Sequence, residues 1–238
     1  MIFQKTKLEG AYIVELDKKE DMRGFFARAF CANEFEAHGL SPRVAQANMS
    51  YNHHKGTLRG MHYQVPPASE PKFIRCIRGA IWDVIVDMRP DSPTYLQHFG
   101  VELSADNRRA IYVPDMFAHG NQALTDGAEL LYLVGEFYTP GCERGLRYDD
   151  PVLGIEWPLP VSVISEKDKS WPLLWWLPND HCRYRSQTTG SRRPAHPRRH
   201  GGRRLHGQRH GQPDHQQRAR HAAGSHCQPQ RGSCCICL

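Results

Sequence analysis

KFIRCIRGAIWDVIVDM, residues 72–88, contains two runs of β-branched and aromatic side chains with Arg78-Gly79 between them. Val, Ile, Phe and Trp favour strands, and glycine after a polar residue favours a turn. The stretch therefore predicts one strand over residues 72–77 and a second over residues 80–88.

Shorter runs of the same kind lie on both sides of this stretch. They cover residues 12–16, 25–30, 94–103, 110–113 and 129–138, and turn residues such as Thr125-Asp126-Gly127 separate them. Many short strands at this spacing favour an antiparallel sandwich or barrel over alternating strands and helices. We expect an all-β fold, a double-stranded β-helix or jelly roll of the cupin type, with a few short helices.

The segment that follows the expected strands, residues 151–177, is rich in Pro and Trp and contains Ser165-Glu166-Lys167-Asp168. We expect it to cross the barrel as coil with one short helix. That path would bring Asp168 to a site formed mainly by residues far earlier in the chain.

The composition of the chain changes near residue 180. All five Trp lie before that point, whereas residues 181–238, the basic tail, contain 12 Arg, no Lys and one acidic residue, Asp214. A segment with so few apolar side chains cannot offset the entropy lost on folding. We expect one domain over residues 1–180 and a low-complexity tail over residues 181–238 that is disordered or derived from a frameshift.

The basic tail makes nucleic-acid binding a function to consider, because Arg-rich segments attract phosphate groups. The tail has no Trp or Phe, and its one Tyr is Tyr184, so it lacks rings on which bases could stack. We therefore do not expect a nucleic-acid partner. No run of apolar residues approaches membrane-spanning length and no signal peptide is visible, which predicts a cytoplasmic protein without membrane contact.

Two glycine-flanked histidines are the first candidates for chemistry. They lie in GTLRGMHYQ, residues 56–64, and in PDMFAHG, residues 114–120, which are spaced like the two motifs of a cupin. A metal-binding cupin has a second His at the position of residue 64 and a Glu soon after. This chain has Gln64 instead, and Glu70 lies slightly later in the sequence than that pattern requires. Two histidines without a third ligand make an incomplete site, so we expect no metal. From the residues alone, His62 could be structural or catalytic.

A longer set of motifs occurs in order and with the spacing of one known family. It comprises Asp21-Met22-Arg23-Gly24-Phe25-Phe26, QANMS (46–50), LRGMHYQ (58–64), Lys72, FAHG (117–120), Tyr132, Tyr138 and SEKD (165–168). This set resembles the dTDP-4-dehydrorhamnose 3,5-epimerase family from the N-terminus to about residue 178. The resemblance implies a jelly-roll homodimer that epimerises the sugar nucleotide dTDP-4-dehydro-6-deoxyglucose at C3 and C5 without a cofactor.

The resemblance also implies catalytic roles. A proton on carbon beside a ketone is weakly acidic, and its removal leaves an enolate whose charge must be stabilised. His62 would be the base, Asp168 would orient its imidazole, and Lys72 would offset the enolate charge. Tyr132 would deliver a proton to the opposite face, which inverts the carbon centre.

The substrate-binding residues come from the same resemblance. Those implied for the diphosphate and sugar are Arg23, Arg59 and Lys167; those implied for other ligand contacts are Phe26, Gln46, Ala47, Asn48, His119 and Glu143; and Tyr138 is implied to stack on the base. Two positions depart from the family, with Arg28 in place of Glu and Asn121 in place of an aromatic residue. Arg28 leaves the nucleobase preference open.

Three other functions stay open. The same scaffold could epimerise C3 only, or act as a ketoisomerase on a related nucleotide sugar. It could also bind a sugar nucleotide without turnover. The site residues quoted above are common to all three, so the sequence does not separate them.

Overall fold

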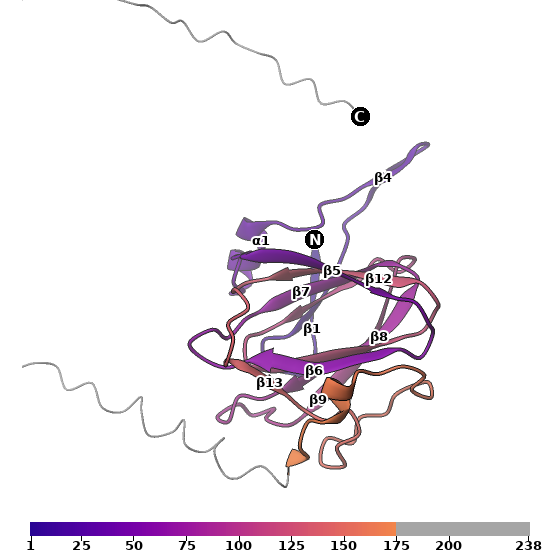
Figure 1. Ribbon diagram of the computed structural model, residues 1–238. Helices are drawn as coiled ribbons and strands as arrows, with labels where there is room; N and C mark the ends of the chain where they lie inside the picture. The colour runs from indigo at the N-terminus through magenta and orange to yellow at the C-terminus, as the bar shows by residue number, and fades with distance from the viewer. Residues whose placement is uncertain (175–238) are drawn as a thin grey trace, which may run out of the picture. The chain divides into compact units, whose positions relative to one another are not determined.

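The computed structural model describes residues 1–174, and they fold into strands with two short helices (Figure 1). The elements are β1 (Ile2–Lys5), β2 (Tyr12–Glu15), β3 (Lys19–Asp21), β4 (Gly24–Phe26), α1 (Ala32–Ala37), β5 (Gln46–Asn52), β6 (Leu58–Gln64), β7 (Lys72–Arg78), β8 (Ala80–Asp87), β9 (His98–Ser104), β10 (Ala110–Val113), β11 (Phe117–Ala123), β12 (Ala128–Val134), β13 (Glu143–Gly145) and α2 (Glu166–Lys169). The expected basic tail and its boundary at residue 180 lie outside the described residues.

Two antiparallel sheets form the body of the fold. One has the strand order β1-β2-β10-β7-β12-β5, and the other has the order β13-β6-β11-β8-β9. The predicted strands over residues 72–77 and 80–88 correspond to β7 and β8, but they join different sheets. The turn at Gly79, whose φ is +68°, passes the chain from one sheet to the other. The expected all-β jelly roll with short helices is confirmed.

Three of the predicted strand ranges were too long. The strand expected over residues 25–30 ends at Phe26. The strand expected over residues 94–103 begins only at His98, because the Thr94 hydroxyl donates to Asp87 and holds the preceding residues in turns. The strand expected over residues 129–138 ends at Val134, where the chain turns away toward the open side of the barrel.

Apolar side chains fill the space between the sheets on the side of β8, β9 and β10. Ile74, Ile85, Ile111 and Leu130 are fully buried there with Phe117. Burying each such side chain contributes roughly 1.5–3 kcal/mol. The space beside β5, β6 and β12 has no such filling and remains open as a cavity. The core therefore holds the sheets apart at a fixed spacing around that opening.

The strap, which we define as residues 160–174, crosses the five-stranded sheet along β6 (Figure 1, orange). The Leu58 amide donates to the Val163 carbonyl at 2.8 Å, and the Ser162 amide donates to Gly56 at 3.0 Å. Gly56 is required at this crossing, because its φ is +78° and a Cβ there would lie 2.8 Å from the Pro160 oxygen. The expected coil and short helix are present in this segment.

The hairpin formed by β3 and β4, here called the arm, projects from the body (Figure 1). Its two strands pair only with each other. Met22 at its tip is 100% exposed and Phe26 is 75% exposed. Met22 and Phe26 thus present apolar side chains that residues 1–174 leave exposed. Separately, no helix in residues 1–174 is both long and apolar enough to cross a bilayer.

Candidate active site

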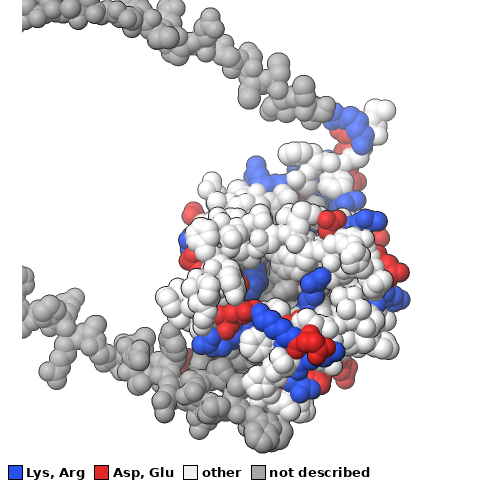
Figure 2. Space-filling view, in the orientation of Figure 1, with Lys and Arg blue, Asp and Glu red and all other residues white. Residues whose placement is uncertain are grey.

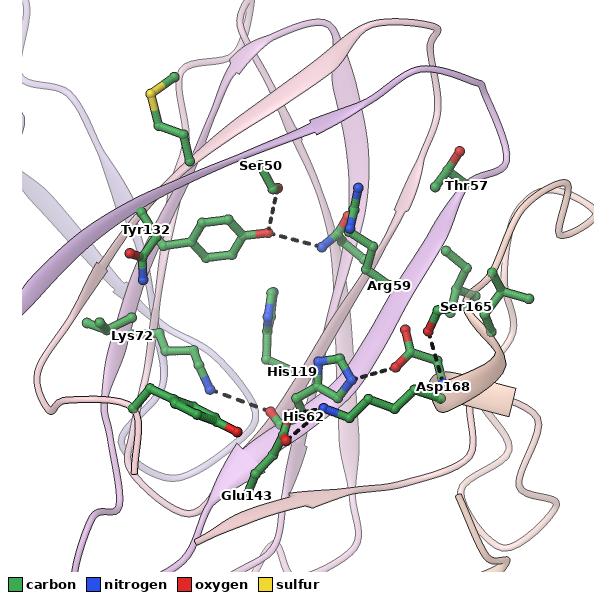
Figure 3. Close-up of a pocket in the computed structure, with 18 of the residues that line it drawn as sticks. Ser50, Thr57, Arg59, His62, Lys72, His119, Tyr132, Glu143, Ser165 and Asp168 are labelled. Carbon is green, nitrogen blue, oxygen red and sulfur yellow. Dashed lines mark hydrogen bonds and ion pairs between the residues drawn. The ribbon is translucent and has the colours of Figure 1, made fainter. Parts of the chain in front are cut away.

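A cavity of about 650 Å³ opens between the two sheets. Figure 2 shows this face hollowed, with basic and acidic side chains gathered around the opening. The four residues predicted to be catalytic, His62, Lys72, Tyr132 and Asp168, all line the cavity (Figure 3). They come from β6, β7, β12 and α2, so folding brings together residues from four separate elements.

His62 and Asp168 form a hydrogen-bonded pair on one wall of the cavity. His62 Nε2 lies 2.6 Å from Asp168 Oδ1, and the Gly60 amide donates to Asp168 Oδ2 at 3.3 Å. An ionised carboxylate can only accept hydrogen bonds, so His62 Nε2 carries the hydrogen of the neutral ring. His62 Nδ1 is then left with a lone pair. This pairing gives the imidazole the tautomer that a base requires.

An irregularity in β6 allows Arg59 and His62 to line the same cavity although they are three residues apart. In the pairing with β11, His62 lies opposite His119 and Arg59 lies opposite Asn121. Three steps along β6 therefore match two steps along β11, which is the arrangement of a bulge. This bulge cancels the strand alternation that would otherwise place the two side chains on opposite faces.

Asp168 has a lowered pKa, although its side chain is buried. Burial alone would raise the pKa, but the hydrogen bond with His62, the charge of that ring when protonated and the Gly60 amide outweigh it. The side chain is ionised at neutral pH as a result. It can therefore stabilise the imidazolium that forms when His62 accepts a proton.

This lowered pKa predicts a pH dependence of stability. The ionised form of Asp168 stabilises the fold above the unfolded pKa of about 3.9, and the effect is lost as pH falls through the lower folded pKa. Below about pH 4, we expect the free energy of unfolding to fall more steeply in the wild-type chain than in Asp168→Asn. Urea unfolding at a series of pH values measures both slopes. Equal slopes would contradict an ionised, hydrogen-bonded Asp168.

Tyr132 reaches into the cavity from the opposite sheet. Its hydroxyl lies 3.1 Å from Ser50 Oγ, and Asn121 Nδ2 donates to it at 3.4 Å. Burial raises the pKa of Tyr132 to about 12. The phenol is therefore protonated at neutral pH and can act as a proton donor, facing the His62 wall from across the cavity (Figure 3).

Lys72 is buried beside a carboxylate. Its Nζ lies 3.0 Å from Glu70 Oε1 and 3.5 Å from the His62 carbonyl oxygen. Glu70, which lies slightly later in the sequence than the Glu ligand of a metal-binding cupin, thus pairs with Lys72. The Lys72 ammonium group lies beside the His62 backbone, within the cavity, where it could stabilise a negative charge.

A second histidine and aspartate pair lies next to the first. His119 Nε2 is 2.8 Å from Asp83 Oδ2, and Asp83 is fully buried, which raises its pKa. Because His119 is directly opposite His62 in the sheet, two paired imidazoles stand side by side. Within residues 1–174, no group of three or more His, Cys, Asp or Glu side chains is placed to hold a metal ion.

Basic and aromatic side chains lie toward the mouth of the cavity. Lys167 Nζ is 2.7 Å from both carboxylate oxygens of Glu143, and the hydrogen bond with Glu143 raises the pKa of Lys167. Arg59 Nε donates to Asn52 Oδ1 at 2.8 Å. The predicted binding residues that line the cavity are Gln46, Asn48, Arg59, His119, Tyr138, Glu143 and Lys167.

Three predicted binding residues do not line this cavity. Arg23 and Phe26 lie on the exposed arm, where Arg23 pairs with Asp21 of the same hairpin. Ala47 lies on β5 between Gln46 and Asn48 and is exposed, because alternate residues of a strand point to opposite faces. None of the three lines the cavity of its own chain, and their contact with the ligand stays a prediction.

The position of Arg28 bears on its predicted effect. Its guanidinium lies 3.2 Å from Glu34 Oε1, beside the base of the arm, and it does not line the cavity. Any influence of Arg28 on the nucleobase would thus depend on where the arm docks.

Sequence reasoning missed several cavity residues. Glu70 lines the cavity beside Lys72, and Ser50 lines it beside Tyr132. The buried Asp83 carboxylate lies within hydrogen-bond distance of His119. One signal was available for Ser50, which follows Gln46 and Asn48 at the two-residue spacing of one strand face. Another was available for Asp83, an acid inside an otherwise apolar strand.

The chain resembles known proteins over the same residues. A family model described as dTDP-4-dehydrorhamnose 3,5-epimerase matches residues 5–175. A dTDP-4-dehydrorhamnose 3,5-epimerase from Methanothermobacter thermautotrophicus is 43% identical over 175 residues, covering 72% of this chain and 94% of the relative. A dTDP-4-dehydrorhamnose 3-epimerase from Streptomyces niveus is 38% identical over 168 residues, covering 70% of this chain and 81% of that one.

A solved structure gives the same fold. The dTDP-6-deoxy-D-glucose-3,5-epimerase of Legionella pneumophila, crystallised with dTDP-4-keto-L-rhamnose, superimposes with a TM-score of 0.70 at 36% identity. The match covers 76% of this chain and 96% of that one.

Proposed function

The chain belongs to the dTDP-4-dehydrorhamnose 3,5-epimerase family and is an isomerase, and we propose that its cavity epimerises dTDP-4-dehydro-6-deoxyglucose at C3 and C5. One observation carries this proposal. The paired base His62 and the protonated Tyr132 face each other across the cavity, with the Lys72 ammonium between the sheets. Removal and return of a proton on opposite faces of a carbon requires this arrangement.

Proton removal is assigned to the His62 wall. His62 Nδ1 takes the proton from the carbon beside the keto group, and the electron pair of that C–H bond moves to form the enolate. Asp168 stabilises the imidazolium by accepting its Nε2 hydrogen. The positive charge of the Lys72 ammonium group offsets the negative charge that develops on the enolate oxygen.

Inversion is assigned to Tyr132. The phenol donates its proton to the face of the carbon opposite His62, and the enolate collapses back to the ketone. Ser50 and Asn121 hold the hydroxyl in place and can stabilise the phenolate that is left. A single base could only return the proton to the face from which it came.

Binding of the diphosphate is assigned to the mouth of the cavity. Arg59 and Lys167 supply positive charge, which suits a diphosphate anion. The Tyr138 ring lies at the same mouth and offers a face for a nucleobase. The relative crystallised with its nucleotide sugar supports this class of ligand.

Deuterium incorporation from D₂O tests the proposed reaction. We expect incorporation at both C3 and C5 of dTDP-4-dehydro-6-deoxyglucose, followed by mass spectrometry and proton NMR. Incorporation at C3 alone would favour the alternative for which the Streptomyces niveus relative is named. A folded chain that incorporates no deuterium at either carbon would contradict the epimerase proposal.

We also propose that the chain is a homodimer in which the arm of each chain reaches the cavity of the other. The resemblance implies that Arg23 and Phe26 contact the ligand, yet they lie on a hairpin outside their own cavity. The arm exposes Met22 and Phe26, and exposed apolar groups favour a partner surface. A two-fold dimer would place each arm at an equivalent site on the other chain.

Mixing two inactive variants tests the shared site. One variant is His62→Asn, and the other carries Arg23→Ala and Phe26→Ala. Refolded together in equal amounts, they should regain about a quarter of wild-type activity, because half of the dimers are mixed and each has one complete cavity. Light scattering measures the dimer, and the exchange assay measures activity. Activity equal to the sum of the two separate variants would contradict the shared site.

A further inference from the structure

Trp171 of the strap packs beside the His62–Asp168 pair, and the proposed function gives it no role. Its indole meets the His62 imidazole edge to face, with the ring centroids 6.5 Å apart. The Lys167 ammonium lies 6.0 Å from the indole centroid. Trp171 therefore contacts both the proposed base and the helix α2 that carries Asp168.

Gly145 of β13 lies directly beneath this indole. A side chain at Gly145 would overlap Trp171, and Gly145 is paired with His62 in the sheet. The indole Nε1 is buried and has no hydrogen-bond partner within residues 1–174. Packing against glycine and imidazole therefore sets the position of the indole, because no hydrogen bond of the described chain does so.

The segment that carries Asp168 is short, and besides Trp171 it is attached to β13 by the Lys167–Glu143 ion pair at 2.7 Å. On its N-terminal side, Val163 bridges to Thr57, and the Asp168 amide donates to Ser165 Oγ at 3.1 Å. On its C-terminal side, Trp171 is the first large side chain to pack against the body of the fold. Helix α2 is a single turn and cannot hold its own orientation without such contacts.

We propose that Trp171 is a positioning residue for the proton-transfer pair. It packs α2 against β6 and β13, and so keeps Asp168 Oδ1 within hydrogen-bond distance of His62 Nε2. This inference rests on the proposed function, since it acts through the proposed base. A displacement of about 1 Å at a reacting group can cost roughly 100-fold in rate.

Two substitutions at Trp171 measure this role in the deuterium exchange assay. Trp171→Ala is expected to lower kcat by about 10- to 100-fold. The dissociation constant for dTDP should stay within about twofold, because Arg59 and the Lys167–Glu143 pair remain. Trp171→Phe is expected to recover most of kcat, since a phenyl ring keeps the edge contact with His62.

Gly145→Ala provides an independent approach to the same contact. Its methyl group should displace the indole and reproduce the loss of kcat in the wild-type background. In a Trp171→Ala background there is no indole to displace, so Gly145→Ala should add little further loss. Trp171→Ala should likewise add less than about threefold to the loss in Asp168→Asn, because both act on one unit.

Gly100 and Trp82 form a matched control pair. A Cβ on Gly100 would lie 2.6 Å from the Trp82 indole, so the same glycine-under-tryptophan packing occurs away from the cavity. Gly100→Ala should lower the melting temperature without lowering kcat, which separates a loss of stability from a loss of positioning.

Three outcomes distinguish the possibilities. Unchanged kcat in Trp171→Ala, with exchange intact in the wild-type chain, would overturn the role of Trp171 alone. Losses that multiply in full between Trp171→Ala and Asp168→Asn would also overturn it, because the indole would then act apart from the pair. A wild-type chain that shows no exchange would instead contradict the proposed function.

Discussion

Replacing His62 by Asn is expected to reduce deuterium exchange at C3 and C5 by about two to four orders of magnitude, the usual contribution of a general base. Asparagine keeps a polar side chain of similar reach but cannot accept and carry a proton at neutral pH. Binding of dTDP should be little affected, because the positive groups at the cavity mouth are unchanged. Quenched-flow exchange and calorimetric titration measure the two effects separately.

His54 provides the control for this substitution. It is an exposed histidine that does not line the cavity, so His54→Asn should exchange at the wild-type rate. If His62→Asn retained wild-type exchange, another group would have to be the base. If the wild-type chain bound dTDP but neither it nor the variant exchanged, the chain would be a binding protein rather than an enzyme.

Replacing Tyr132 by Phe is expected to separate exchange from inversion. His62 can still remove a proton and return a deuteron to the same face, so deuterium should enter substrate that keeps its configuration. Formation of inverted product should fall by about two orders of magnitude or more, because no acid remains on the opposite face. Proton NMR of the recovered sugar distinguishes labelled substrate from labelled product.

Tyr51→Phe is the matched control, because Tyr51 is on β5 and does not line the cavity. Its ratio of exchange to inversion should equal that of the wild-type chain. Equal losses of exchange and inversion in Tyr132→Phe would show that the tyrosine is needed for proton removal itself. Undiminished inversion would assign the second proton transfer to a different group.

Local composition predicted the strands but not their partners. The β-branched runs of residues 72–77 and 80–88 are strands because their side chains suit a pleated, buried surface. That these neighbours join different sheets depends on contacts with β12 and β11 far along the chain. Such pairings are set by packing of the whole fold, which no short window of sequence contains.

The candidate site, like the fold, could be predicted only in part from the sequence. His62, Lys72, Tyr132 and Asp168 were predicted to lie together through a resemblance to a family, and the structure brings them to one cavity. Glu70 and Trp171 were missed, because their importance arises only from what lies beside them after folding. Arg23 lies outside the cavity of its own chain and stays a predicted ligand contact, since sequence motifs do not say which copy of a chain completes a site.

The strap is the last part of the described active site to be synthesised. Asp168 meets His62 across 106 residues of chain, and synthesis proceeds from the N-terminus. A nascent chain exposed up to β13 already contains both sheets and most of the cavity wall. Until the strap emerges and crosses β6, its base has no carboxylate partner. The carboxylate partner of the proposed base and Lys167, one of the proposed diphosphate contacts, are therefore the last parts of the cavity to be synthesised.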